Sequence, residues 1–333
     1  MMKTVDMHCD TVSELWKREQ AGEKISLLDC DCHINLRKMK QGDYLLQNFA
    51  LFVNMEACAD PWEHVQELFA LYERLMKENA GLIVPVTCTD EIERNRLSGK
   101  MSALLTVEEG GVCKGSLEKL DILYSQGVRM LTLTWNYQNE LGSPNIDRKK
   151  KPTLQDTFVP NVSDGMTEMG FAFVERMEEL GMIVDVSHLS DAGFWDVARR
   201  AKRPFVASHS NARQICPCVR NLTDEMIRAL AEKGGVTGLN FCADFLTKAQ
   251  ENTPNPGTVE AVVRHAKHIV KVGGMECLGL GSDFDGIDTH AELPGADAME
   301  RLWHALVRGG FTQDQADAVF GGNVLRLYRE VLG

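Results

Sequence analysis

A histidine and an aspartate separated by one residue, His8 and Asp10, end the first apolar run of the chain, which begins at Thr4. Alternate residues of a strand point to the same side of the backbone. An imidazole nitrogen and a carboxylate oxygen placed in this way can bind one divalent metal ion. The same pair also occurs in strands that bind no metal, so the interpretation needs further ligands elsewhere in the chain.

Further side chains of the metal-binding type follow later apolar runs. They are Glu108 and Glu109, His188, His209 and Asp283, and each comes at or just past the end of a predicted strand. Taken singly, a histidine of this kind is more often a hydrogen-bonded core residue, and a carboxylate more often belongs to a loop. The repeated position at strand ends is not expected by chance. In a parallel barrel all these ends open on one face, so we expect the side chains to converge there.

The residue types suit hydrolysis of an amide bond. Two metal ions about 3.5–4 Å apart can activate a water molecule and polarise a carbonyl group. A glutamate carboxylate can bridge two such ions, and neutral imidazoles with one further carboxylate can complete their ligand shells. The chain offers this set as His8, Asp10, Glu108, His188 and His209.

Short apolar runs alternate with longer amphipathic stretches over the whole chain. The runs predict eight strands: Thr4–His8, Asn48–Val53, Ala103–Val107, Arg129–Thr134, Ile183–Ser187, Phe205–Ser208, Val236–Asn240 and Cys277–Gly281. The amphipathic stretches predict helices: Trp62–Asn79, Leu117–Ser125, Met166–Leu180, Ala192–Ala201, Asp224–Glu232, Val259–Val272, Asp297–Val307 and Asn323–Val331. This alternation predicts an α/β fold, a single-domain (β/α)8 TIM-like barrel over residues 1–333, with the metal site at the carboxyl ends of the strands. A doubly wound sheet is the alternative, but no G-x-G-x-x-G fingerprint supports it.

The composition excludes several classes of partner. The formal net charge is −12, and the sequence has no basic face interleaved with aromatic residues. Both observations argue against nucleic acid and anionic membranes as partners. No apolar run approaches the roughly 20 residues of a membrane helix, and the N-terminal residues lack an apolar signal region. The ten cysteines are scattered, so we expect free thiols, including the pairs Cys30 and Cys32 and Cys216 and Cys218, and a cytoplasmic protein.

Two other features carry weaker expectations. The remaining histidines fall in predicted helices or loops and are interpreted as surface or packing residues: His33, His64, His265, His268, His290 and His304. The longest irregular stretch runs from Asn136 to about Gly165. Loops of this length in compact domains are often functional, and this one follows a strand, so we expect it to overhang the catalytic face.

The motifs, in their order along the chain, resemble those of the renal (membrane) dipeptidase family, the zinc-dependent dipeptidases of the amidohydrolase-like barrels. The resemblance covers nearly the whole chain and is specific as a set, although no single motif is. The segments that carry it are Asp6–Asp10, Val107–Gly111, Gly127–Thr134, Asp185–His188, Ser208–Ser210, Arg220–Asn221 and Gly281–Gly286.

The resemblance implies a site with two zinc ions. His8 and Asp10 would bind the first ion and His188 and His209 the second. The family has one glutamate before the glycines, whereas this chain has two. Counting without a gap from the Leu131–Thr134 segment selects Glu108 as the bridge rather than Glu109.

The family also suggests roles outside the ligand set. Asp283 would handle the proton of the catalytic reaction, and Arg220 would bind the terminal carboxylate of a dipeptide with its guanidinium group. One position departs from the pattern: better-known members carry a histidine where this chain has Trp135, followed by Asn136. Either residue is a candidate for substrate binding and for stabilising the oxyanion.

The predicted function is therefore hydrolysis of dipeptides, and the resemblance implies tolerance of a C-terminal D-residue and a possible homodimer. Because Trp135 departs from the family pattern, a second hydrolase function is an alternative. Such an enzyme would cleave a lactam, an N-acyl amino acid or another small amide with the same metals. The third reading is a metal-free relative that serves as a binding or assembly protein, and the intact ligand set argues against it.

Overall fold

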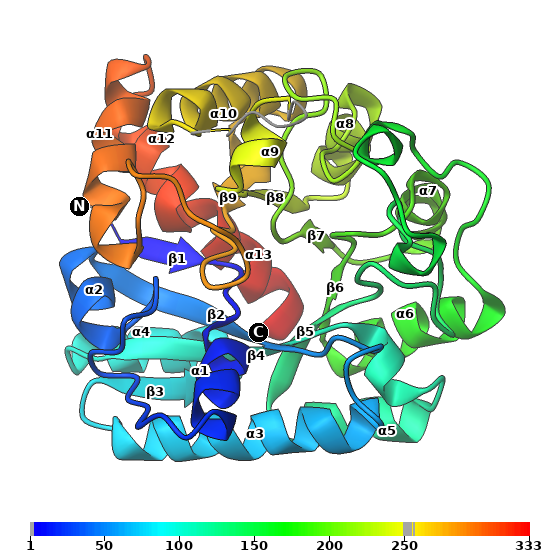
Figure 1. Ribbon diagram of the computed structural model, residues 1–333. Helices are drawn as coiled ribbons and strands as arrows, with labels where there is room; N and C mark the ends of the chain where they lie inside the picture. Colours follow the sequence, from blue (N-terminus) through cyan, green and yellow to red (C-terminus); the bar gives the residue numbers. More distant parts are fainter. Residues whose placement is uncertain (1–2, 249–254, 256) are drawn as a thin grey trace.

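Nine parallel strands form the sheet of the protein in the computed structural model, which describes residues 3–248, 255 and 257–333. They are β1 (Thr4–Asp6), β2 (Tyr44–Phe52), β3 (Ile83–Val86), β4 (Met101–Glu108), β5 (Val128–Thr132), β6 (Ile183–Asp185), β7 (Val206–Ala207), β8 (Val236–Leu239) and β9 (Leu278–Leu280). The order β2-β1-β9-β8-β7-β6-β5-β4 closes on itself because β2 also pairs with β4. The predicted eight-stranded parallel barrel is confirmed (Figure 1).

Strand β3 is the element of the sheet that the sequence patterns did not predict. It pairs only with the first half of β4, from Ile83 opposite Met101 to Val86 opposite Leu104. Strand β5 pairs with the second half of β4, so β3 lies outside the closed ring. Its four residues include Pro85, a residue that suits an edge strand and weakens the strand signal in the sequence.

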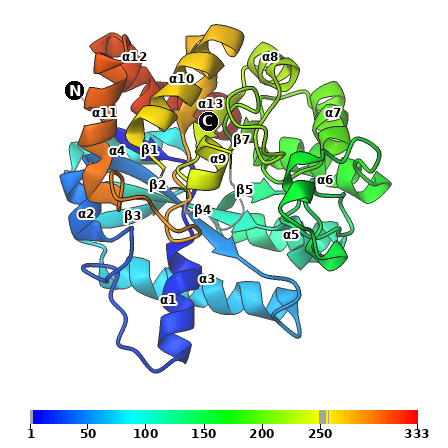
Figure 2. The ribbon, with the colours of Figure 1, turned by 45° about the horizontal axis from the view of Figure 1, so that its top comes forward.

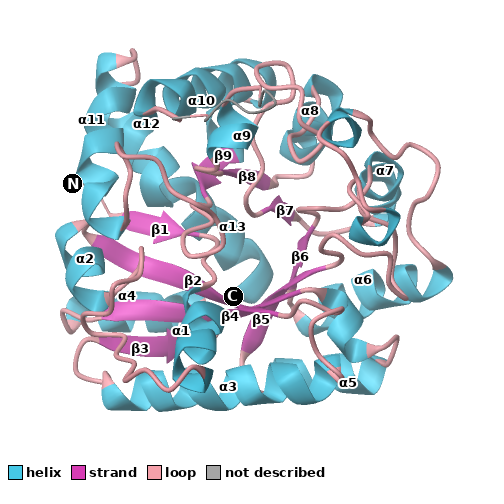
Figure 3. Ribbon diagram, in the orientation of Figure 1, coloured by secondary structure: helices cyan, strands magenta, loops and turns pink. Residues whose placement is uncertain are grey.

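Helices surround the ring of strands (Figure 3). They are α1 (Thr11–Gln20), α2 (Leu36–Gln41), α3 (Pro61–Glu78), α4 (Thr89–Leu97), α5 (Leu117–Ser125), α6 (Glu168–Leu180), α7 (Asp191–Arg200), α8 (Asp224–Glu232), α9 (Ala243–Leu246), α10 (Val259–Gly273), α11 (Met299–Arg308), α12 (Gln313–Asp317) and α13 (Asn323–Leu332). All eight predicted helices are present, whereas α1, α2, α4 and the short α9 were not predicted. The short α12 begins with a capping box of Thr312 and Gln315, which the Thr-x-x-Gln pattern of the sequence indicates. Figure 2 shows α1 beside α3, where both flank the outer side of the barrel. Within the described ranges, no helix has the length and apolar character needed to cross a membrane.

Helix α13 lies behind the strands in Figure 1 and packs against the start of the barrel. Its residues Val324, Leu327 and Tyr328 share one buried cluster with strand residues such as Val5 and Leu46. The phenolic oxygen of Tyr328 accepts a hydrogen bond of 2.6 Å from the side-chain amide of Asn48 inside the ring. Because this end is filled, the opposite end, where the strands finish, is the one left for a site.

Candidate metal centre

The carboxyl end of β1 is tied to the segment that follows β9. The backbone N–H of Asp10 donates to the carbonyl of Phe284 at 2.9 Å, and the N–H of Asp283 donates to the carbonyl of His8 at 3.3 Å. These bonds bring the side chain of Asp283 to those of His8 and Asp10, although Asp283 lies more than 270 residues later in the sequence.

His8 and Glu108 lie at the centre of the cluster. The Nε2 atom of His8 is 3.3 Å from Oε2 of Glu108, 3.6 Å from Oδ2 of Asp10 and 3.9 Å from Oδ1 of Asp283. All four side chains are buried, with His8 only 1% exposed. The predicted convergence of β1, β4 and β9 on one point is therefore observed.

The second oxygen of Glu108 faces the two later histidines. Its Oε1 atom lies 3.0 Å from Nε2 of His188 and 3.7 Å from Nε2 of His209. The two Nε2 atoms are 3.0 Å apart, and the ring of His209 stacks on that of His8 with centroids 4.0 Å apart. One carboxylate thus lies between a His8–Asp10 side and a His188–His209 side.

Burial and neighbouring charges shift the pKa values of the three histidines in different directions. Burial lowers the pKa of His8, but the charges of Glu108 and Asp10 outweigh burial and raise it well above its usual value. Burial lowers the pKa of His188 to about 4, helped by the charge of Arg220. Burial and the charge of His8 also hold the pKa of His209 well below its usual value. His188 and His209 therefore favour the neutral form, in which imidazoles bind metals, whereas the carboxylates around His8 favour a positive charge at that point.

Several buried atoms of the cluster lack a hydrogen-bond partner among the described residues. They are both ring nitrogens of His8, Oδ1 of Asp10 and Oε1 of Glu108. Buried polar atoms are almost always paired, so unpaired atoms that converge indicate a missing ligand. The donor atoms form two overlapping groups, His8 with Glu108 and His209, and His8 with Asp10 and Asp283, each within 4.8 Å. This arrangement fits divalent metal ions that share ligands.

Two buried aspartates position these ligands, and the sequence analysis did not single them out. Asp6 accepts hydrogen bonds from the backbone and the hydroxyl of Ser282 at 2.9 and 2.6 Å. Asp185 accepts in the same way from the backbone and hydroxyl of Ser208 at 2.8 and 2.6 Å. The Ser208 oxygen then lies 2.7 Å from Nδ1 of His209, which leaves Nε2 of that ring toward Glu108. The sequence feature that could have identified them is an aspartate inside an otherwise apolar strand, two or three residues before a ligand histidine.

Glu109 faces away from the cluster. Its carboxylate accepts hydrogen bonds from the backbone N–H of Trp135 at 3.0 Å and from the side chain of Asn139 at 3.3 Å. Burial raises the pKa of Glu109 to about 7. Glu108 is thus the glutamate that contacts the histidines, whereas Glu109 holds the segment after β5.

The two candidates in that segment occupy different places. The ring of Trp135 lies half-buried with its centroid 4.8 Å from the ring of Phe52 and 6.2 Å from that of His188. The side-chain oxygen of Asn136 lies 2.9 Å from Nδ1 of His188. Asn136, predicted as a substrate-binding residue, therefore contacts a candidate metal ligand directly.

Arg220 is a buried cation at the edge of the cluster. It is 3% exposed, and its Nε atom has no hydrogen-bond partner among the residues that the structure describes. One terminal nitrogen donates a long bond of 3.5 Å to the carbonyl of His209. Burial lowers the pKa of Arg220, while the charges of Asp283 and Glu108 oppose that shift. A buried guanidinium without an ion pair within the described ranges is costly in free energy.

Asp283 has a strained backbone and a perturbed carboxyl group. Its φ is 63°, and His188 likewise has φ of 68°, a conformation that residues other than glycine adopt rarely. Burial raises the pKa of Asp283 to about 7, and Asn240 donates a hydrogen bond of 2.8 Å to its Oδ2 atom. A carboxyl group of this kind can both accept and release a proton near neutral pH.

The long segment after β5 covers this end of the barrel, as expected. The N–H of Asn145 donates to the carbonyl of His188 at 3.1 Å, and the N–H of Arg148 donates to the carbonyl of Asn136 at 2.8 Å. The guanidinium of Arg148 lies 5.3 Å from the ring centroid of Trp135. The segment thus lies over Trp135 and the His188 loop.

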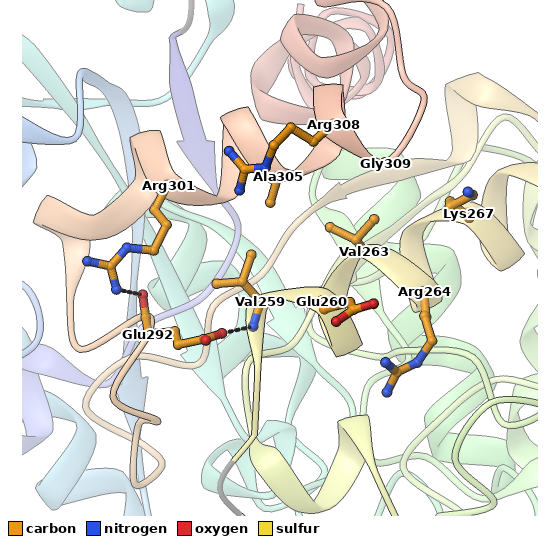
Figure 4. A pocket seen from close by; sticks show the side chains of 10 residues that line it. All are labelled: Val259, Glu260, Val263, Arg264, Lys267, Glu292, Arg301, Ala305, Arg308 and Gly309. Carbon is orange, nitrogen blue, oxygen red and sulfur yellow. Dashed lines mark hydrogen bonds between the residues drawn. The ribbon is translucent and has the colours of Figure 1, made fainter.

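A separate hollow of 470 Å³ lies in the helical layer between α10 and α11 (Figure 4). There the carboxylate of Glu292 accepts a hydrogen bond of 2.6 Å from the N–H of Val259 at the start of α10. Arg301 donates to the carbonyl of Glu292 at 2.8 Å. Because none of the predicted ligands lines this hollow, it is distinct from the candidate metal centre.

Comparison with known proteins agrees with the site. The sequence model for membrane dipeptidase, peptidase family M19, matches residues 1–332. An uncharacterized dipeptidase of Schizosaccharomyces pombe is 30% identical over 353 residues, which covers 98% of this chain and 80% of that protein. The crystal structure of a metallopeptidase, dipeptidase AC of family M19, is 25% identical with a TM-score of 0.88 and covers 100% of this chain and 99% of its own.

A further solved structure is similar over its whole length. It is a metallopeptidase of Rhodobacter sphaeroides bound to a phosphinate mimic of the dipeptide L-Ala-D-Ala, 25% identical with a TM-score of 0.86, and 99% of each chain is covered. The family model, the fold and the buried histidines and carboxylates agree, and they support a metal-dependent dipeptidase. The chain therefore belongs to the membrane dipeptidase family, peptidase family M19.

Proposed function

We propose that the protein hydrolyses dipeptides with two zinc ions at the carboxyl end of the barrel. His8 and Asp10 would hold one ion, His188 and His209 the other, and Glu108 both. The observation that carries this proposal is the position of Glu108, whose Oε2 is 3.3 Å from His8 and whose Oε1 is 3.0 Å from His188. Bound zinc supplies a Lewis acid for the scissile carbonyl and lowers the pKa of water.

Arg220 would bind the free carboxylate of the substrate. Its guanidinium is buried near Asp283 and Glu108 without a carboxylate partner among the described side chains, and a dipeptide carboxylate would supply one. An anchor at the C-terminal end of the substrate, a short distance from the scissile bond, restricts cleavage to the last peptide bond. In a dipeptide this is the single peptide bond of the substrate.

Asp283 would take the proton of the attacking water and deliver it to the leaving amine. Its Oδ1 atom lies 3.9 Å from Nε2 of His8, and its Oδ2 atom accepts a hydrogen bond from Asn240. Oδ1 is therefore the oxygen that would accept the proton. The pKa of about 7 that burial gives Asp283 suits both halves of this transfer.

Tolerance of a C-terminal D-residue is part of the proposal. The similar enzyme of Rhodobacter sphaeroides is solved with a mimic of L-Ala-D-Ala. Recognition of the terminal carboxylate by Arg220 does not by itself select the L or the D configuration of the C-terminal residue. We therefore expect both L-Ala-L-Ala and L-Ala-D-Ala to be substrates.

The experiment that tests the function uses the purified chain stripped of metal and then titrated with zinc. L-Ala-D-Ala, its N-acetyl form, its C-terminal amide and a β-lactam are assayed in parallel. We expect activity on the free dipeptide that reaches its maximum at two zinc ions per chain and is lost on both blocked forms. Preferred cleavage of the N-acetyl form or the lactam would instead support the alternative hydrolase raised by Trp135.

A further inference from the structure

A second hollow lies at the carboxyl end of β2, the strand that pairs with β4 and its terminal Glu108. It has a volume of 580 Å³ and lies between α1, the segment after β2 and the start of α3. The apolar part of its wall comes from Trp16, Phe52, Ala57, Cys58 and Ala59. Its volume falls in the range of small-molecule sites, and aromatic side chains line it on two sides.

Three contacts connect this hollow to the candidate site. Phe52 lines the hollow and packs edge-on against Trp135, whose ring in turn lies beside His188. Asn54 also lines it and accepts a hydrogen bond of 3.2 Å from the hydroxyl of Tyr137. In the parallel pairing of β2 with β4, the backbone of Phe52 also stands opposite that of Glu108.

The topology of the barrel places the hollow opposite Arg220. In the ring order β1, β2, β4, β5, β6, β7, β8 and β9, strand β2 is four places from β7. Arg220 lies between β7 and α8, whereas the hollow lies between β2 and α3. A dipeptide whose carboxylate is at Arg220 and whose amide bond is at Glu108 therefore extends its N-terminal residue toward β2.

The walls indicate which side chain fits. Trp16 and Phe52 present aromatic surface, and the ring of Trp16 is fixed edge-on against His64 with centroids 4.4 Å apart. The polar rim is acidic, since Glu63 and Glu67 lie on it beside the single cation Lys17 among the residues that line the hollow. A large apolar side chain gains burial there, whereas an acidic side chain meets like charge.

We propose that this hollow is the subsite for the N-terminal side chain of the substrate and that it selects large apolar, especially aromatic, residues. The proposal rests on the dipeptidase function above and deepens it by naming the preferred class of dipeptide. It assigns Phe52 and Trp16 as specificity-determining residues that contact the substrate side chain. Trp135, whose ring lies against both Phe52 and His188, then borders the path of the substrate from the metal centre to this subsite.

The test compares kcat/KM for Phe-Ala, Gly-Ala and Glu-Ala on the zinc-loaded enzyme. We expect Phe-Ala to exceed Gly-Ala by about tenfold or more, because filling an apolar pocket discriminates by at least that factor, and Glu-Ala to be the poorest of the three. Ala59→Trp and Ala57→Trp place an indole in the hollow from exposed positions of the wall. Each should lower the ratio of Phe-Ala to Gly-Ala at least tenfold, mainly through KM.

Ala80→Trp is the matched control, since Ala80 is exposed beyond the far end of α3 and does not line the hollow. It should leave the Phe-Ala to Gly-Ala ratio as in the unmodified enzyme. Equal rates on Phe-Ala and Gly-Ala, or a ratio that neither tryptophan variant changes, would overturn the subsite while leaving the dipeptidase function intact. Failure to cleave any dipeptide at all would overturn both.

Discussion

The side-chain oxygen of Asn136 lies 2.9 Å from Nδ1 of His188, on the side of the ring away from Glu108. An amide oxygen accepts a hydrogen bond, so Nδ1 carries the proton and Nε2 keeps its lone pair for a metal ion. Asn136 thus resembles the carbonyl and carboxylate partners that orient metal-binding histidines in many proteins.

Asn136→Ala should therefore weaken zinc binding by about 10- to 100-fold, because it frees the His188 ring to rotate and to change tautomer. Competition with a chelator of known affinity measures the effect. Asn136→Asp keeps an acceptor in place and should restore most of the affinity. A rise in KM with unchanged zinc affinity would instead support the substrate-binding role expected from the sequence.

The two adjacent glutamates should respond differently to the same change. Glu108→Gln should lower zinc affinity by more than about 100-fold, because the amide cannot offer an anionic oxygen to each side of the cluster. Glu109→Gln should change it by less than about tenfold, since Glu109 contacts Trp135 and Asn139 instead. Metal content by elemental analysis and chelator competition distinguish the two, and equal losses would show that the bridging assignment is wrong.

Arg220→Met should separate stability from substrate binding. Removing a buried cation that has no carboxylate partner within the described ranges relieves a desolvation cost, so Tm should stay the same or rise. KM for a dipeptide should increase by about 30-fold or more, since the substrate carboxylate loses its charged partner. Zinc content should not change. A variant that keeps a normal KM, or that loses its metal, contradicts the role assigned to Arg220.

His265, which is not one of the candidate metal ligands, should make the folded state sensitive to acid. Its Nδ1 accepts a hydrogen bond from the N–H of Ala212 at 3.1 Å, and its Nε2 lies 3.0 Å from the carbonyl of Leu246, so the native ring is neutral. Burial lowers its pKa to about 4. Between pH 6.5 and 4 the unfolded chain therefore binds a proton that the native chain does not, and stability falls as pH falls.

The measurement is urea unfolding at pH 7 and pH 5 for the unmodified protein and for His265→Gln. The unmodified protein should lose about 2 kcal/mol more of its unfolding free energy between these pH values than the variant does. Zinc release at low pH affects both proteins alike and cancels in this difference. Equal losses would mean that His265 titrates normally in the native state.

The site residues at the strand ends could be predicted because histidines and carboxylates recur at the same position after several apolar runs. His8, His188, His209 and Asp283 each follow a short apolar run, and parallel strands bring such ends together whatever their separation in sequence. The ring of eight strands followed from the same runs, which are long and apolar enough to recognise. Strand β3 could not be predicted from such a run, because four residues that include a proline give almost no alternation of apolar and polar residues.

The side chains that hold the ligands could not be predicted in the same way. Asp6 and Asp185 accept hydrogen bonds from the hydroxyl and backbone groups of Ser282 and Ser208, which follow neighbouring strands. Such pairings depend on the register of the strands, which cannot be read from the sequence. The contact of Asn136 with His188 likewise depends on the path of the segment after β5. The hollow beside β2 is formed by loops and helix ends, whose positions follow from tertiary packing alone.

The central claim is that one carboxylate joins two metal ions inside this barrel. An anomalous difference map at the zinc absorption edge, from crystals of the zinc-loaded protein, tests it most directly. We expect two peaks about 3.5–4 Å apart, one against His8 and Asp10, the other against His188 and His209, with Glu108 touching both. A single peak, or peaks that Glu108 does not reach, would contradict the account.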